Sequence, residues 1–248
     1  MPFTLAHPAV LFPILKRSKY FSGTALIIGS MVPDVEFIAQ MEKISTYSHS
    51  FPGALLFNIP VGLFLCWLFH AIIKYFLISN SPVFLQSRLQ FIMEMDWLQY
   101  AKENKIVVFY SLLIGIASHL VWDAFTHDTG FFISILPSLK SNITFLNREM
   151  PIFHSLQIIS SVLGLLAVAY LVWRLPKVQL SHHEISWNFW ISFGLVILIL
   201  SLVRFYLVDF RNGFWDVVIA FMGIAMYAII INSFCHLLWL RKPRKSKP

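Results

Sequence analysis

The segment IVVFYSLLIGIASHLVWDAFT, residues 106–126, is predominantly apolar and carries one histidine and one aspartate near its end. A run of about 20 apolar residues is typical of a transmembrane helix. Ionisable groups are rare inside such helices because a charge is costly in lipid, and those that occur usually mark a functional site. This one segment therefore predicts a membrane protein and locates its site.

The composition of the whole chain agrees with this reading. Of 248 residues, 58% are hydrophobic and only 12% are charged, which is far from the balance of a soluble domain. We predict an all-α polytopic membrane helical bundle of about six spanning helices, preceded by a short N-terminal re-entrant or half-depth helix over residues 3–15. The expected spans are residues 21–40, 52–78, 106–126, 153–173, 187–208 and 214–240.

We expect a single integral membrane domain over residues 1–248. Residues 79–105 mix aromatic, aliphatic and charged side chains at helical spacing, which predicts an interfacial helical linker. Residues 241–248 form a basic tail. The net charge of +7 suits an anionic membrane surface better than nucleic acid, so membrane lipids are the expected partners and nucleic acid is not. No nucleotide cofactor is expected, because the sequence has neither a GxGxxG motif nor a P-loop.

Charge gives the expected orientation. Lys and Arg concentrate on the cytoplasmic side of membrane proteins. If the tail is cytoplasmic and the segments alternate, 14 of the 19 Lys and Arg residues lie on the inner side. We therefore expect an integral protein of a bacterial cytoplasmic membrane with a cytoplasmic C-terminus.

The same alternation, obtained without the histidines, places five histidines and two aspartates at the outer ends of the segments. Imidazole and carboxylate groups are the usual ligands of zinc and similar divalent ions. The sequence thus predicts a metal site open to the outer side. Its candidate ligands are His7, Asp34, His49, His119, Asp123, His127 and His154.

Within this set, the spacing of His119, Asp123 and His127 is the most specific signal. Residues four apart on a helix advance about 400°, so these side chains form one stripe over two turns. An imidazole and a carboxylate placed in this way can ligate one ion, or two ions bridged by the carboxylate. Simpler interpretations remain: the first two could form a structural hydrogen-bonded pair, and Asp34 could merely cap a helix.

Three further motifs indicate a family. PFTLAHPAVLFP near the start, GSMVPDVEF and HSFPG together resemble the uncharacterised membrane proteins of domain-of-unknown-function family 4184. More distantly, the order His, Asp, His, HxxxD, His, His is similar to the ligand string of zinc-dependent phospholipase C, P1-type nucleases and related membrane-bound metal-dependent hydrolases.

The distant resemblance implies a helical bundle whose helix ends converge on divalent ions, and cleavage of phosphate esters. It implies zinc as the metal, with manganese or magnesium as alternatives. Two departures put at least one metal of the soluble enzymes in doubt. Their freed N-terminal amine has only Met1 as a counterpart, and their final HxxxE motif is lost because Ile158 follows His154 at that spacing.

The leading hypothesis is a membrane-embedded metal-dependent hydrolase, similar to a phospholipase C or phosphatase, acting on a lipid or another phosphate ester. The candidate ligands would hold one to three ions, with Asp34 and Asp123 as candidate catalytic carboxylates. Arg148 or Arg211 would bind the phosphate. The alternative is a non-catalytic metal-binding or transport-associated membrane protein that uses the same residues.

Overall fold

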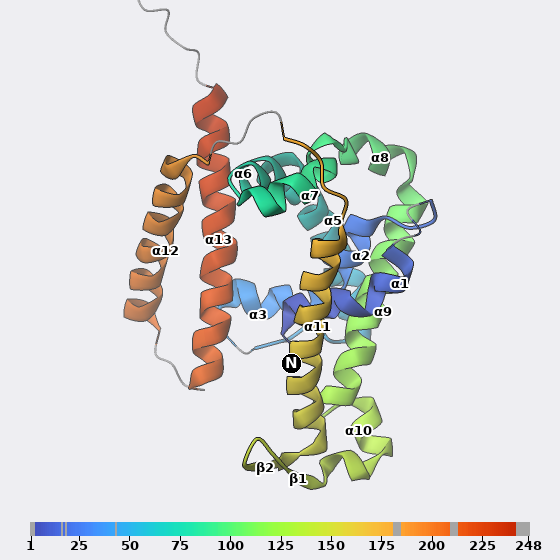
Figure 1. Cartoon of the computed structure of the whole chain (residues 1–248). Coiled ribbons are helices and arrows are strands. Elements are labelled where there is room, and N and C mark those ends of the chain that lie inside the picture. Colours follow the sequence, from blue (N-terminus) through green and yellow to red (C-terminus); the bar gives the residue numbers. More distant parts are fainter. Residues whose placement is uncertain are drawn as a thin grey trace, which may run out of the picture. The chain divides into compact units, whose positions relative to one another are not determined.

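The computed structural model of the protein describes residues 3–15, 17, 19–42, 44–180, 185–208 and 213–241. This part of the chain is mostly helical (Figure 1). Five helices within it are long and apolar enough to cross a membrane, and they confirm the last five predicted segments. They are Phe51–Ser79, Lys105–Ile135, Ile152–Arg174, Trp187–Leu207 and Trp215–Trp239.

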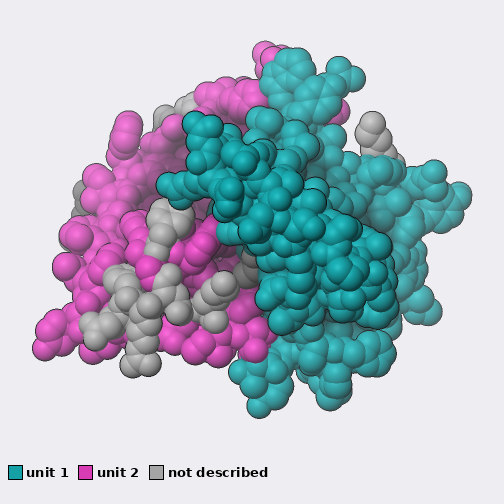
Figure 2. Space-filling model, turned by 90° about the horizontal axis from the view of Figure 1, so that it is seen from below, with its two compact units in different colours: residues 1–35, 46–66, 101–174 teal, residues 36–45, 67–100, 175–248 magenta. Residues whose placement is uncertain are grey.

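The chain forms two compact units, which are coloured separately in Figure 2. Unit 1 comprises Met1–Val35, Thr46–Cys66 and Ala101–Arg174, and it holds all the described candidate ligands. Its elements are η1 (Thr4–Leu11), α1 (Phe12–Leu15), α2 (Gly23–Gly29), η2 (Val32–Asp34), α4 (Phe51–Gly53), η3 (Ala54–Asn58), α9 (Lys105–Thr126), α10 (Phe131–Ile135), η5 (Pro137–Lys140), β1 (Asn142–Phe145), β2 (Arg148–Pro151) and α11 (Ile152–Arg174).

Unit 2 comprises Glu36–Ser45, Trp67–Tyr100 and Leu175–Pro248. Polar groups tie its segments together: the Asn80 side chain accepts from the Ser186 amide at 2.9 Å, and the half-buried Tyr227 hydroxyl donates to the Ala39 carbonyl at 2.9 Å. Its elements are α3 (Val35–Gln40), η4 (Phe69–Ile73), α6 (Lys74–Ser79), α7 (Val83–Glu94), α8 (Trp97–Glu103), α12 (Trp187–Leu207) and α13 (Phe214–Arg241). Helix α5 (Ile59–Leu68) joins the two units within the continuous helix Phe51–Ser79.

Glycine allows α2 to lie directly against α9 (Figure 1). A Cβ atom on Gly115 would lie 2.5 Å from the Leu26 carbonyl oxygen, which is far inside van der Waals contact. At the start of α2, the Ser22 amide donates to the Ser111 hydroxyl at 3.0 Å, and the Tyr110 hydroxyl donates to the Tyr20 carbonyl. This packing fixes the position of the chain that leaves the end of α2.

The structure corrects two sequence expectations. Residues 21–40 do not form a span but three short pieces, α2, η2 and α3. Pro33 lacks an amide hydrogen, so it cannot continue the hydrogen bonding of α2 and instead lies within the turn η2, which begins at Val32. The fold is also not purely helical, because β1 and β2 pair antiparallel with Phe145 opposite Arg148. Leu146 and Asn147 form the turn with φ angles of 50° and 59°.

Residues 79–105 contain the helices α7 and α8, while their interfacial placement stays a prediction. The apolar helix Thr4–Leu15 is shorter than the five candidate spans, and a re-entrant position for it also stays a prediction. Residues 242–248 of the predicted tail lie outside the described residues.

Replacing Gly115 with alanine tests the helix contact on which the site depends. The added methyl group must push α2 away from α9, which we expect to cost about 1–3 kcal/mol and to lower the midpoint of thermal unfolding in detergent. Gly194→Ala on α12 is the matched control, since nothing lies within 4 Å of a Cβ there. Equal midpoints for the two variants would contradict the close packing.

Candidate metal centre

His119 and Asp123 form the centre of the site on one face of α9. Both are buried, with exposed fractions of 0% and 6%, and His119 Nε2 lies 3.3 Å from Asp123 Oδ2. The four-residue spacing therefore produces the shared face that it predicts. The same buried face of α9 carries the Ser111 hydroxyl that holds the start of α2.

Two further side chains meet this pair from different parts of unit 1. Asp34 ends η2 and is fully buried, with its Oδ1 3.4 Å from His119 Nε2. His49 lies in the turn before α4, with its Nε2 3.4 Å from Asp123 Oδ2 and 3.6 Å from Asp34 Oδ1. One donor atom from each of these four residues lies within 4.8 Å of the other three. We call these four residues the His/Asp cluster.

The spacing of the donor atoms fits a tetrahedral ion. A tetrahedron has edges about 1.63 times its centre-to-corner distance, so bonds of about 2.0–2.1 Å to zinc place the donors about 3.3–3.4 Å apart. The four His–Asp separations in the cluster are 3.3, 3.4, 3.4 and 3.6 Å. These four of the six donor separations exceed an ordinary hydrogen bond and match edges of such a tetrahedron, and the other two are at most 4.8 Å.

The facing polar atoms are left unsatisfied by the protein itself. Within the described part of the chain, His119 Nε2, Asp34 Oδ1 and both carboxylate oxygens of Asp123 are buried without a hydrogen-bond partner. Buried polar groups are normally paired, and exceptions call for a physical reason. A cation among the four donors would satisfy these atoms together.

Contacts behind the cluster orient its donors, as is usual in metal sites. His119 Nδ1 lies 2.8 Å from the Ser30 carbonyl; because a carbonyl only accepts, Nδ1 carries the proton and Nε2 keeps its lone pair. The Thr4 hydroxyl donates to Asp34 Oδ2 at 2.6 Å. Sequence reasoning missed both contacts, since one uses a backbone carbonyl and the other the hydroxyl of a threonine distant in sequence from Asp34.

The charges in the cluster also favour a cation. Burial opposes ionisation of Asp34, yet the neighbouring imidazoles of His119 and His49 hold the pKa of its carboxyl below its usual value. Burial likewise opposes the charged form of His49, but the carboxylates of Asp123 and Asp34 raise the pKa of its imidazole. The carboxylates are therefore anionic and draw positive charge toward themselves.

His7 and His127 flank the cluster on the side of the other Asp123 oxygen. His7 Nε2 lies 3.8 Å from Asp123 Oδ1, and its ring stacks on that of His119. Burial, together with the nearby His119, lowers the pKa of His7 to about 3, so its imidazole is neutral. His127 Nδ1 donates to the Asp123 carbonyl at 3.0 Å and lies 3.7 Å from Asp123 Oδ1. This nitrogen is therefore hydrogen-bonded to the last turn of α9.

The remaining predicted residues do not join the cluster. His154 lies in the first turn of α11 beside Phe153, and among the described residues it makes no hydrogen bond or ion pair with any candidate ligand. Arg148 is exposed on β2. Arg211 lies outside the described residues. The structure thus brings six of the seven predicted ligands together, four of them with donor atoms at mutual ligand distance.

Five apolar helices and the buried His/Asp cluster define a polytopic membrane protein with a site that could bind a metal ion. Comparison of the sequence with known families gives a match over residues 1–234 to the family described as Domain of unknown function (DUF4184), and the chain belongs to that family. No curated protein and no solved structure matches the chain.

Removing a cluster residue should remove the metal. We expect zinc to copurify with the wild-type protein in detergent and to be lost from His119→Ala and Asp123→Ala, measured by inductively coupled plasma mass spectrometry. His154→Ala is the control and should keep its zinc, because this histidine lies outside the cluster. Loss of metal in all three variants, or in none, would contradict the assignment.

The Thr4 hydroxyl provides a finer test. Thr4→Val removes the hydrogen bond to Asp34 Oδ2 at nearly constant volume, and we expect zinc affinity to fall roughly 10- to 100-fold. Thr126→Val is the control, because this buried hydroxyl bonds to the Trp122 carbonyl of its own helix at 3.3 Å. Competition with a chromophoric chelator measures both affinities; similar values would argue against the orienting role of Thr4.

Proposed function

We propose that the protein is a membrane-embedded metal-dependent hydrolase that cleaves a phosphate ester. In this proposal, Asp34, His49, His119 and Asp123 hold a divalent ion. The observation that carries it is the convergence of four donor atoms within 4.8 Å of one another, with His–Asp separations that match four edges of a tetrahedron. The chemistry of the donors, imidazole nitrogen with carboxylate oxygen, is that of hydrolytic zinc sites.

Zinc fits the spacing better than magnesium does. An octahedral ion with bonds of about 2.0–2.1 Å holds neighbouring donors about 2.9 Å apart, and magnesium prefers oxygen ligands. The His–Asp separations here are all at least 3.3 Å, and two of the four donors are nitrogens. Zinc is therefore the proposed metal, and manganese is the next candidate to test.

The cluster is closed on one side and accessible on the other, as hydrolysis requires. Asp34 and His119 are fully buried, whereas the side chains of His49 and His127 are 24% and 30% exposed. Water and a phosphate ester would enter on this accessible side. A bound zinc ion would supply an activated water and would withdraw charge from the phosphoryl oxygens.

The two carboxylates are suited to different tasks. Asp34 Oδ2 accepts the Thr4 hydroxyl, so this side chain is fixed as a ligand through Oδ1. Asp123 directs Oδ2 toward His119 and His49, while its Oδ1 faces the flanking His7 and His127 at 3.8 and 3.7 Å. Asp123 Oδ1 is therefore the atom proposed to accept the proton from the attacking water.

The remaining parts of the proposal rest on the sequence. Arg148 and Arg211 stay proposed contacts for the phosphate, on the ground that arginine binds phosphate through paired hydrogen bonds. The site is proposed to open to the outer side of the membrane, which rests on the distribution of Lys and Arg.

A non-catalytic metal-binding role is the second candidate, and one observation favours it. Four protein donors complete a tetrahedron, which is the arrangement of structural zinc sites, whereas catalytic sites keep a position for water. Catalysis would require one of these four residues to leave a ligand position free for water. His49, on a turn and partly exposed, is the donor best placed to withdraw.

Ester hydrolysis by the zinc-loaded wild type separates these candidates, and an asparagine variant tests whether Asp123 carries that activity. Zinc-loaded wild type should hydrolyse bis-p-nitrophenyl phosphate or a short-chain phospholipid, and Asp123→Asn should lose at least about 100-fold in kcat. Asp128→Asn is the matched control, because its exposed carboxylate pairs with Lys140 at 3.1 Å at the same end of α9. Stoichiometric zinc without hydrolysis of either ester would favour the structural role.

A further inference from the structure

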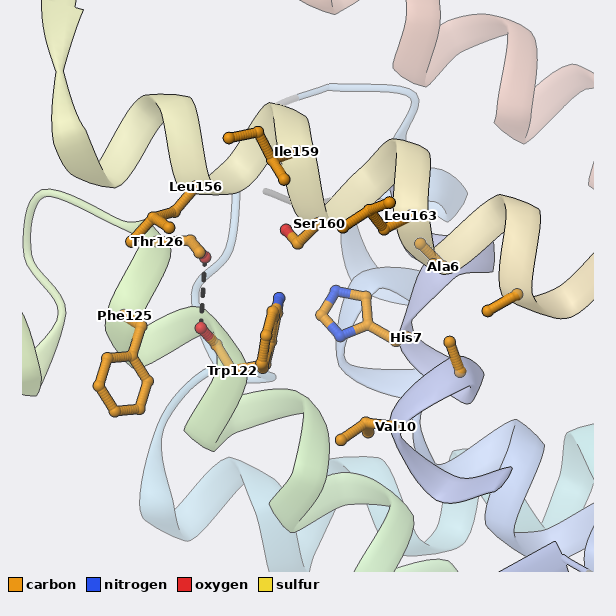
Figure 3. A pocket seen from close by; sticks show the side chains of 13 residues that line it. Ala6, His7, Val10, Trp122, Phe125, Thr126, Leu156, Ile159, Ser160 and Leu163 are labelled. Atoms are coloured by element: carbon orange, nitrogen blue, oxygen red, sulfur yellow. Dashed lines mark hydrogen bonds between the residues drawn. The ribbon is translucent and has the colours of Figure 1, made fainter. Parts of the chain in front are cut away.

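An apolar groove runs alongside the metal centre within unit 1 (Figure 3). Its walls come from η1, the last turns of α9 and the first half of α11, and its volume of about 550 Å³ lies in the range of ligand sites. At its base, α11 approaches η1 so closely that a Cβ on Gly164 would lie 2.7 Å from the Ala6 Cβ.

The hydroxyl groups in the wall of the groove are engaged elsewhere, and the Trp122 indole and the His7 imidazole are the other polar side-chain groups among its lining residues. The Thr126 hydroxyl bonds to the Trp122 carbonyl (dashed line in Figure 3) and the Ser160 hydroxyl to the Gln157 carbonyl, at 3.3 and 3.1 Å. Among the described residues that line the groove, His7 is the one titratable side chain. The groove therefore presents hydrocarbon to its occupant and has little to offer a polar ligand.

The rim of the groove is apolar and exposed. Leu156, Ile159 and Leu163 lie on α11 with exposed fractions of 38%, 38% and 60%, opposite Val10 of η1 at 52%. The three α11 side chains belong to a helix apolar enough to span a membrane, and in a membrane they would face lipid. An occupant can thus enter sideways from the bilayer without crossing water.

We propose that this groove binds one acyl chain of a membrane lipid. Its lining residues on α11 extend from Leu156 to Ala167, about 16 Å at 1.5 Å per residue. That length is close to half of the roughly 30 Å hydrocarbon core of a bilayer, which is the extent of the chains in one leaflet. A single acyl chain therefore matches the groove in chemistry, length and route of entry.

The groove also connects to the metal centre through a shared residue. His7 lines the groove and stacks on His119 with its Nε2 3.8 Å from Asp123 Oδ1. A lipid whose chain lies in the groove would place its headgroup beside the His/Asp cluster. Resting on the proposed function, this geometry assigns the substrate class as a phospholipid or lipid phosphate held by one chain, with its phosphate ester at the ion.

Photolabelling tests the acyl site directly. The full chain is reconstituted in phosphatidylethanolamine and phosphatidylglycerol vesicles with a phosphatidylcholine that carries a diazirine midway along one acyl chain. After irradiation, labelled residues are mapped by mass spectrometry. Labels should concentrate on the groove face of α11 and on residues 122–126, and the Ala167→Trp variant, which fills the groove, should reduce them at least fivefold.

Ala169→Trp is the matched control, because Ala169 lies on the exposed face of the same helix and does not line the groove. It should leave the labelling unchanged, and unchanged zinc content in both variants would show that each is folded. Labels spread evenly around α11, as from bulk lipid, or labelling that Ala167→Trp does not reduce, would overturn the acyl site.

The metal-site variant separates this inference from the proposed function. Asp123→Ala should keep groove labelling, since apolar contacts hold the chain. Groove labelling in a wild-type protein that hydrolyses no ester would support lipid binding and contradict the hydrolase. Zinc-dependent hydrolysis of a water-soluble ester by a protein whose groove stays unlabelled would overturn the acyl site alone.

Discussion

The structure depends on one electrostatic constraint: two buried aspartates face one another and require a positive charge between them. One oxygen of Asp34 and one of Asp123 lie within 4.8 Å of each other, in a setting almost without solvent. Two carboxylates in such a setting repel each other strongly. His119 and His49 lie between them, and their Nε2 atoms complete a donor set that a divalent ion would neutralise.

Unit 1 folds so that residues far apart in the sequence meet at the His/Asp cluster. Helix α9 supplies His119 and Asp123, and the close contact at Gly115 holds α2 beside it, so that the chain leaving α2 presents the Ser30 carbonyl and then Asp34. The Pro33 turn is part of this arrangement, because a continuous helix would carry Asp34 past His119. The site therefore requires the break in residues 21–40, the first predicted span.

The sequence predicted those parts of the structure that leave a signal in hydropathy or in residue spacing. Five long apolar runs became helices, and the spacing of His119 and Asp123 placed both on one face of α9. Pro33 signals a break in residues 21–40, but hydropathy averages over a proline turn, so the sequence could not predict the division into three short pieces. It also could not predict that Thr4 contacts Asp34, or that His154 on α11 lies outside the His/Asp cluster. Both depend on tertiary packing, which no local pattern records.

X-ray absorption spectroscopy at the zinc edge of the purified protein tests the central claim most directly, because it reports the identity, number and distance of the ligands together. The account predicts a first shell of about four nitrogen and oxygen atoms at about 2.0–2.1 Å, with imidazole scattering from two histidines. A sulfur shell at about 2.3 Å, an ion surrounded mainly by water, or no bound zinc after reconstitution would contradict it.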